Sequence, residues 1–296
     1  MKKHQRKGGT IAAIIIIISL IAAAVGWGVL QLWNRMTEYG SSATIVQPPE
    51  EEQEQSYLDA DGTETEEKPA IPENKYASDG FYDRNGLKCY YKAGIRGVPG
   101  IDVSSHQQDI DWKAVKEAGV EFAMIRIGYR GYVSGEIALD EFYEQNMTGA
   151  AENEIPVGVY FFSQALTEEE AVEEAEFVLE WIRDYDIQYP VIFDWEEVEA
   201  QARTDEMNML LLTKCTKAFC DTISEAGYNA GVYFNQAYGY QQLNLPSLQE
   251  YVFWLAEYDD YPSFLYDFQM WQYTCTGTVS GINGPVDLNI AFSKED

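Results

Sequence analysis

The strongest constraint on the fold is an alternation of short β-rich runs with longer helix-like segments, which begins near residue 80. The predicted strands are 99–104, 122–127, 156–162, 189–195, 229–234, 252–257, 268–273 and 286–290, and the predicted helices are 111–118, 138–153, 167–185 and 206–226. Thr167, with Glu170 after it, predicts the start of the third helix, and Gly227 predicts the end of the fourth. This order predicts an α/β barrel of parallel strands with helices between the first five. The connections after residue 257 are too short for full helices, so we expect the last third to be irregular.

The N-terminal segment differs from this globular part. Residues 11–33 contain no charged side chain, and the apolar stretch 11–32 would span about 33 Å as a helix, against about 30 Å for the hydrocarbon core of a membrane. The hydrophobic region of a signal peptide is only about 7–15 residues long, so we expect an uncleaved transmembrane anchor, although the small residues 22–24 leave cleavage open. The basic residues within 1–10 predict a cytoplasmic N-terminus and place the rest of the chain outside the cell.

Residues 34–79 are acidic and contain few large apolar side chains. Such a segment cannot bury enough surface to fold, and its charges repel one another, so we expect a disordered linker between the anchor and a barrel domain at 80–296. The whole chain has a net charge of −29, which argues against a nucleic-acid partner, because binding to phosphates requires a basic surface.

The four cysteines, Cys89, Cys215, Cys220 and Cys275, all follow the linker. An even number outside the membrane permits two disulfides, but Cys215 and Cys220 lie on one predicted helix and are poor partners for each other. A bridge would join one of them to Cys89 or Cys275, or join those two, and four free thiols are the alternative. His106 is the only histidine after the predicted anchor, and no Cys/His cluster accompanies it. A zinc site is therefore unexpected, and we expect neither metal nor cofactor.

Carboxylates end several predicted strands, at the edge where an α/β barrel carries its active site. Asp194 and Glu196 end the fourth strand, and their spacing of two puts both on one side of an extended chain. Asp102 ends the first strand and Asp287 lies on the last. Like charges at close range raise one pKa and so provide an acid beside a base, as cleavage of a glycosidic bond requires. A solvated strand end, or a cap or turn role for each lone aspartate, is the alternative.

Aromatic residues fall at the same strand ends, where their rings would stack on the apolar faces of sugars. The candidate substrate-binding residues are Tyr160, Phe162, Tyr233, Trp254, Tyr258, Trp271 and the basic Arg126. Arg126 would hold a neighbouring carboxylate ionised. The alternatives are ordinary barrel core for the aromatic rings and an ordinary ion pair for Arg126.

Seven short motifs follow one another along the chain: Gly100–Ser104, Phe122–Arg126, Gly158–Phe161, Pro190–Glu196, Trp254–Tyr258, Met270–Tyr273 and Val286–Asn289. Taken in order, they resemble the lysozymes of glycoside hydrolase family 25, the N-acetylmuramidases. The resemblance runs from about residue 98 to about residue 292. It implies a modified TIM-like barrel, with five βα units followed by three strands without regular helices.

The resemblance also implies an activity, namely cleavage of the β-1,4 bond between N-acetylmuramic acid and N-acetylglucosamine in peptidoglycan glycan strands. Glu196 would be the general acid, and Asp102 and Asp287 would be further carboxylates of the cleft. Asp194 would position the 2-acetamido group of the substrate or stabilise the oxocarbenium-like charge directly. With the predicted anchor, we expect a single-pass protein of the cell membrane that remodels the wall from outside. The alternatives are a catalytically silent peptidoglycan-binding barrel and a hydrolase of another N-acetylated polymer such as chitin; the sequence identifies no protein partner.

Overall fold

The computed structural model of the chain describes residues 57–58, 64–65, 71–198 and 200–295. The predicted cytoplasmic N-terminus at 1–10, the predicted anchor at 11–33 and most of the predicted linker lie outside these residues. In the part that is described, no helix is long and apolar enough to cross a membrane. The first described elements, the two-residue strands β1 (Tyr57–Leu58) and β2 (Glu64–Thr65), pair antiparallel with each other.

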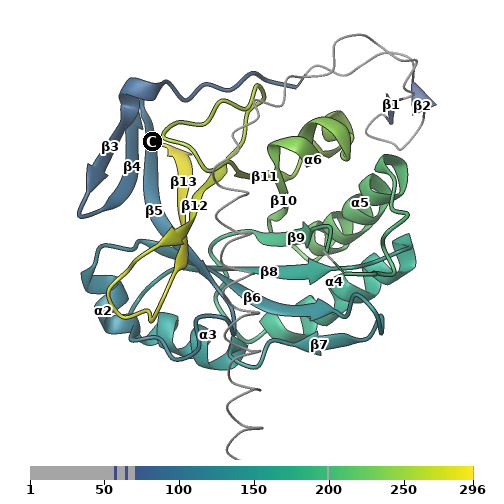
Figure 1. Cartoon of the computed structure of the whole chain (residues 1–296), viewed down its shortest axis with the longest axis horizontal. Helices are drawn as coiled ribbons and strands as arrows, with labels where there is room; N and C mark the ends of the chain where they lie inside the picture. The colour runs from purple at the N-terminus through teal and green to yellow at the C-terminus, as the bar shows by residue number, and fades with distance from the viewer. Residues whose placement is uncertain (1–56, 59–63, 66–70, 199, 296) are drawn as a thin grey trace, which may run out of the picture. The chain divides into compact units, whose positions relative to one another are not determined.

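Eight strands form a closed barrel (Figure 1). They are β5 (Ile95–Val103), β6 (Phe122–Arg130), β8 (Val157–Ser163), β9 (Val191–Trp195), β10 (Ala230–Asn235), β11 (Val252–Ala256), β12 (Met270–Gly277) and β13 (Val286–Lys294). The pairing of β5 with β6 closes the ring, and every strand expected in the barrel is present, so the prediction of a barrel is confirmed.

The expectation that all barrel strands run parallel is wrong for β13, which is antiparallel to both β12 and β5. The chain passes from β12 to β13 through residues 278–285, a connection without a helix. A crossover to a parallel neighbour takes about a dozen residues or more, so a connection this short returns the chain in the opposite direction. The start of β13 therefore lies at the same end of the barrel as the C-terminal ends of the other strands.

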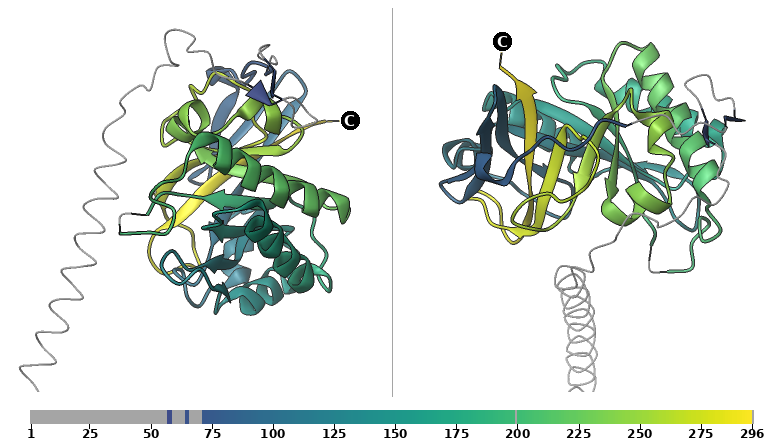
Figure 2. Two further views of the ribbon diagram at one scale, coloured as in Figure 1. Left: turned by 90° about the vertical axis from the view of Figure 1, so that its right-hand side faces the viewer. Right: turned by 90° about the horizontal axis from the view of Figure 1, so that it is seen from above.

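Helices cover the outside of the barrel (Figure 1; Figure 2). They are α2 (Trp112–Glu117), α3 (Tyr143–Glu152), α4 (Glu168–Ile182), α5 (Met209–Glu225) and α6 (Gln236–Gln241), with short 3₁₀ helices η1 (Ser78–Gly80) and η2 (Leu245–Leu248). The Oγ1 atom of Thr167 accepts the backbone N–H of Glu170 at 3.2 Å, which caps α4 as predicted. Gly227, with φ +92°, follows the end of α5 as predicted. The second helix begins later than predicted, because Ile137–Leu139 form strand β7 against β6.

The apolar residues divide between the two faces of the barrel strands. A small cluster fills the interior and comprises Phe122, Met124, Ile192, Trp254, Met270 and Ala291. A larger cluster lies between the barrel and the helices. It contains the strand residues that alternate with the inward-facing ones, such as Val191 and Phe193 on either side of Ile192, together with the inner faces of the helices. Because each strand is buried on both faces, its sequence is a continuous apolar run rather than an alternating one.

The segment before the barrel is more ordered than predicted. Strands β3 (Phe81–Arg84) and β4 (Leu87–Lys92) extend the sheet antiparallel from β5. The predicted linker is wrong at its C-terminal end, since residues 71–79 pack against the barrel. The ring of Tyr76 stacks on Phe292 with centroids 3.8 Å apart, and its hydroxyl donates to the carbonyl oxygen of Phe268 at 2.5 Å. One large aromatic side chain anchors a stretch whose average composition is that of a linker.

The cysteines are all free: Cys89, Cys215 and Cys220 are buried, and Cys275 is half-buried. The free-thiol alternative is therefore the one that the structure supports.

Candidate active site

The four predicted carboxylates meet at one end of the barrel. Asp102, near the end of β5, lies opposite Asp287 in the register between β5 and β13. Asp194 lies near the end of β9, and Glu196 follows directly after that strand. The charges of Glu196, Asp102 and Asp287 all act on Asp194, so the side chains share one site. Parallel strands carry their C-terminal ends to this edge, and the antiparallel β13 brings its first residues there.

Burial raises the pKa of every member of this cluster, and repulsion between the carboxylates raises it further for Asp194, Glu196 and Asp287. Burial raises the pKa of Asp102 from 3.8 to about 6. Burial, then the charges of Glu196 and Asp102, raise the pKa of Asp194 well above its usual value. Burial and the charge of Asp102 raise the pKa of Glu196, against a hydrogen bond from Tyr233 that lowers it. Burial and the charges of Asp102 and Glu196 likewise raise the pKa of Asp287. Such a cluster keeps its protons to a higher pH than isolated carboxyl groups do.

Two buried amides, absent from the predicted set, hold Asp102 in place. The Nε2 group of Gln272 and the Nδ2 group of Asn289 both donate to Asp102 Oδ2, at 2.9 and 2.8 Å. These bonds favour the ionised form of Asp102 and oppose the effect of burial on its pKa. The strand period of two was the available signal, because Asn289 shares a face with Asp287.

The aromatic residues at this end of the barrel surround the amides. The hydroxyl groups of Tyr233 and Tyr258 both donate to Gln272 Oε1 at 2.9 Å. Tyr258 is 39% exposed, so its ring remains available for contact. Tyr160 is half-buried, and Phe162, also half-buried, lies beside Asp194 in the register of β8 and β9. Four of the predicted aromatic residues therefore lie where a ligand of the carboxylates would contact them.

An open acceptor lies among these groups. The Oδ1 atom of Asp194 is buried and has no hydrogen-bond partner in the described part of the chain. A buried acceptor without a donor is costly, and it gains most from a ligand that brings one. The geometry thus combines proton donors of raised pKa, an unfilled acceptor and accessible rings. Within the described residues, no group of three or more His, Cys, Asp or Glu side chains is arranged to hold a metal ion.

The sequence profile of the glycosyl hydrolases family 25 matches residues 101–282. The chain belongs to this family. It is therefore a glycosidase, and its fold is the closed eight-stranded barrel of family-25 structures. The match ends before β13, so Asp287 and Asn289 enter the site through the structure rather than through the profile.

Several known proteins are similar to this chain over about two thirds of its length or more. Lysozyme M1 of Streptomyces globisporus is 27% identical over 207 residues, which cover 67% of this chain and 68% of that protein. The YegX protein of Escherichia coli K12 is 25% identical over 198 residues, covering 65% of this chain and 69% of that protein. The solved structure of the modular autolysin LytC of Streptococcus pneumoniae has a TM-score of 0.58 at 25% identity. That alignment covers 82% of this chain and 62% of LytC, less than two thirds of its length.

Two tryptophans of this family-25 enzyme do not serve as predicted. Trp254 is 1% exposed in the barrel interior, where its Nε1 group donates to Asn289 Oδ1 at 2.9 Å. Trp271 is 0% exposed and belongs to the cluster outside the barrel, with its Nε1 group bonded to the carbonyl oxygen of Glu257 at 2.8 Å. The prediction that these rings stack on a sugar is wrong, since neither has a surface to offer. Strand alternation turns Gln272 inward and therefore turns Trp271 outward.

Arg126 forms the ordinary ion pair that was the alternative for it. Its Nε group donates to Asp140 Oδ2 at 2.8 Å and its Nη2 group to Ser105 Oγ at 3.0 Å. The charge of Arg126 still reaches the site, because it opposes the rise in the pKa of Asp194. Its role toward the carboxylates is thus electrostatic, without a direct bond in the structure.

Proposed function

We propose that this family-25 glycosidase is a muramidase that cleaves the β-1,4 bond between N-acetylmuramic acid and N-acetylglucosamine in peptidoglycan. The observation that carries the proposal is the pair Asp194 and Glu196, whose pKa values are both raised and of which Asp194 has an open acceptor oxygen. The family supports it, as do the names of two similar proteins, Lysozyme M1 and the autolysin LytC. LytC has also been solved in complex with a synthetic peptidoglycan ligand.

Glu196 supplies the proton in this proposal. It follows directly after β9, where its carboxyl group can reach a bond lying across the barrel end. Burial and the charge of Asp102 raise its pKa, which favours the protonated form that donates to the leaving oxygen. Asp102, fixed by two amides, supplies the negative charge that keeps its neighbours protonated.

Asp194 faces the sugar whose bond is broken. Its open Oδ1 atom accepts the N–H of the 2-acetamido group, or else its charge stabilises the positive charge that develops on the ring. Both roles require a substrate with charge or a donor near this oxygen, which an N-acetylated sugar provides. Tyr258, Tyr160 and Phe162 are the rings on which the sugar faces pack, and Asp287 completes the acidic lining.

The enzyme is, in this proposal, tethered to the outer face of the cell membrane by residues 11–33 and acts on the wall of its own cell. The support is the sequence: a basic head followed by an uncharged segment long enough to span the membrane. Fractionation of cells that produce the full-length chain, with mass spectrometry of its N-terminus, tests this. Intact chain in the membrane fraction is expected, and a chain cleaved near residues 22–24 and released to the medium would contradict it.

The activity is tested with the full-length chain in detergent and purified peptidoglycan. The fragments are reduced with borohydride and identified by mass spectrometry. Reduced muramic acid ends are expected, and reduced glucosamine ends would contradict the assignment of the bond. Retained wall binding without fragments would favour the silent binding barrel, and faster cleavage of chitin oligosaccharides than of peptidoglycan would favour the other polymer.

A further inference from the structure

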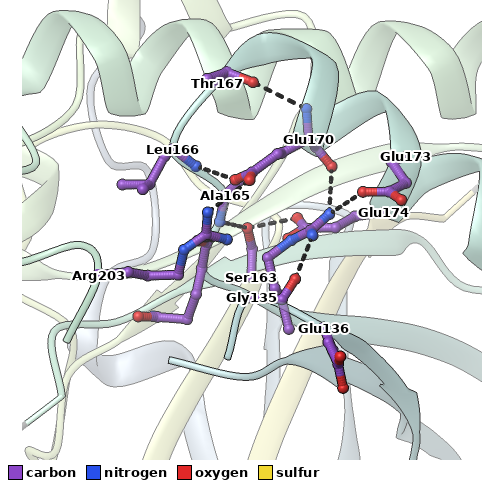
Figure 3. A network of polar contacts seen from close by, with 12 residues as sticks. Gly135, Glu136, Ser163, Ala165, Leu166, Thr167, Glu170, Glu173, Glu174 and Arg203 are labelled. Atoms are coloured by element: carbon purple, nitrogen blue, oxygen red, sulfur yellow. Dashed lines mark hydrogen bonds and ion pairs between the residues drawn. The ribbon is translucent and has the colours of Figure 1, made fainter. Parts of the chain in front are cut away.

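A buried network of polar groups lies beside the end of β9 and joins three elements (Figure 3). Glu174 on α4 is fully buried, and both of its carboxylate oxygens are bonded. Arg130, at the end of β6, donates from Nε to Glu174 Oε1 at 2.7 Å, and Ser163, at the end of β8, donates from Oγ to Glu174 Oε2 at 2.6 Å. The ends of β6 and β8 are therefore fastened to the same residue of α4.

A second layer of the network fixes the turn between β8 and α4. The Nη2 group of Arg203 donates to Glu170 Oε1 at 2.6 Å, and Glu170 Oε2 accepts the backbone N–H of Leu166 at 2.8 Å. The carbonyl oxygen of Glu170 in turn accepts from Arg130 at 3.0 Å. Figure 3 shows Glu170, Glu173 and Glu174 turned from α4 toward these partners. Residues 163–167 are thus held on both sides.

Gln164 connects this rigid turn to the active site. The ladder between β8 and β9 ends at the pair Ser163 and Trp195, so the next residue in the chain, Glu196, has no partner in this ladder. The side chain of Gln164, fully buried, replaces the ladder: its Nε2 group donates to the carbonyl oxygen of Glu196 at 2.9 Å. Its Oε1 atom accepts from Thr204 Oγ1 at 2.6 Å. The side-chain amide of Gln164 therefore forms a hydrogen bond with each end of the segment 196–204.

We propose that Gln164 is the positioning residue for the general acid, because its bond to the carbonyl oxygen of Glu196 fixes the backbone from which the acidic side chain extends. The inference rests on the proposed function, in which Glu196 donates the proton. A displacement of about 1 Å in a reacting group costs about 10²-fold in rate, so a carboxyl group beyond the last strand pair needs such a support. The charged network holds the turn that carries Gln164 in place, and Gln164 in turn holds the backbone of Glu196.

The test compares two substrates whose leaving groups differ in their need for a proton, and so distinguishes a loss of acid catalysis from a loss of any other function of the site. A sugar leaving group needs a proton, whereas a 2,4-dinitrophenyl group on the same N-acetylmuramic acid-containing disaccharide does not. Full-length Gln164→Met, which keeps the volume and removes both hydrogen bonds, should lose about 10- to 100-fold in kcat on peptidoglycan with KM changed less than about threefold. On the dinitrophenyl glycoside it should lose less than about threefold.

The matched variants sharpen this result. Thr204→Val removes only the hydrogen bond from Thr204 to Gln164 Oε1. It should show a loss of about two- to fivefold on peptidoglycan and none on the dinitrophenyl glycoside. Glu173→Gln changes an exposed partner of Arg130 that has no hydrogen bond to Gln164, and should behave as wild type. Equal losses on both substrates, or no loss in Gln164→Met, would overturn the positioning role. If Gln164→Met does not fold, Thr204→Val decides, and the absence of a selective loss overturns the proposal. A wild-type chain inactive on both substrates would instead contradict the proposed function.

Discussion

Two regions of this barrel contain buried carboxylates, and they differ in whether those carboxylates have hydrogen-bond donors and cations as partners. In the network at α4, Glu174 has a donor on each oxygen and Glu170 is paired with Arg203. At the barrel end, Asp194 has an oxygen without a partner, and Arg126, the cation that acts on it, is itself bonded to Asp140. The carboxylates of the first region have hydrogen-bond donors and cations as partners, whereas those of the second region repel one another and one of their oxygens has no donor.

The contrast indicates which region is built for stability and which for chemistry. A buried charge with partners in good geometry offsets much of its desolvation cost, whereas unmatched carboxylates in one site destabilise the folded state. Groups whose pKa values are raised by burial and by each other gather at functional sites, where they serve as acids. On this account the unmatched cluster is the proposed active site, and the matched network is the support proposed beside it.

The largest expected effect comes from breaking the matched region. Arg130→Met leaves Glu174 buried without its cation and should lower the free energy of unfolding at pH 7 by about 3–5 kcal/mol, measured by urea denaturation. At pH 5 the loss should shrink, because burial raises the pKa of Glu174 to about 7 and the carboxyl group is then neutral. Arg183→Met, which removes an exposed partner of Asp184, is the control and should change less than about 0.5 kcal/mol. A loss no larger than that of the control would refute the contrast.

The unmatched region should respond in the opposite direction. Asp102→Asn keeps an oxygen for Gln272 and Asn289 but removes a charge from the cluster, so the free energy of unfolding at pH 8 should rise by about 1–3 kcal/mol. Activity should fall, because the charge that keeps Glu196 protonated is lost. Asp184→Asn, on an exposed side chain, is the matched control for the loss of one charge. A destabilised Asp102→Asn variant would show that the cluster contributes to stability after all.

The same argument fixes the pH dependence of stability. The pKa of Asp102 rises from 3.8 to about 6 on folding, so the folded protein binds more protons than the unfolded chain between these values. The free energy of unfolding should therefore fall as the pH rises from about 4 to about 6, by up to about 1.4 kcal/mol per pH unit for this group. Glu174, with a pKa raised from 4.5 to about 7, has the same sign. Thermal denaturation should give a lower Tm at pH 7.5 than at pH 5 and a flatter profile in Asp102→Asn; a Tm that rises over this range would contradict the argument.

Much of the fold follows from the sequence because strand and helix periods are local. The eight barrel strands were predictable from short apolar runs, and α4 from Thr167 and Glu170. The direction of β13, the edge strand β7 and the packing of Tyr76 were not, because each depends on partners far along the chain. Pairing between distant segments leaves little trace in a single local pattern.

The site divides in the same way. The four carboxylates could be placed from strand ends, since a parallel barrel carries those ends to one edge. The supporting amides could not, because Gln272, Asn289 and Gln164 act through side-chain hydrogen bonds whose partners depend on three-dimensional register. The two tryptophans were misassigned because an aromatic residue near a strand end faces either the barrel end or the core, and motif position alone does not distinguish them.

The most direct test of the account compares Glu196→Gln with Glu197→Gln in the full-length chain, by the initial rate of release of reduced muramic acid ends from peptidoglycan. The neighbouring Glu197 is exposed and serves as the matched control. We predict that Glu196→Gln loses about 10²- to 10⁴-fold in rate while still binding peptidoglycan, and that Glu197→Gln cleaves as wild type. A Glu196→Gln enzyme that retains more than about a tenth of the wild-type rate would contradict the assignment of Glu196 as the general acid.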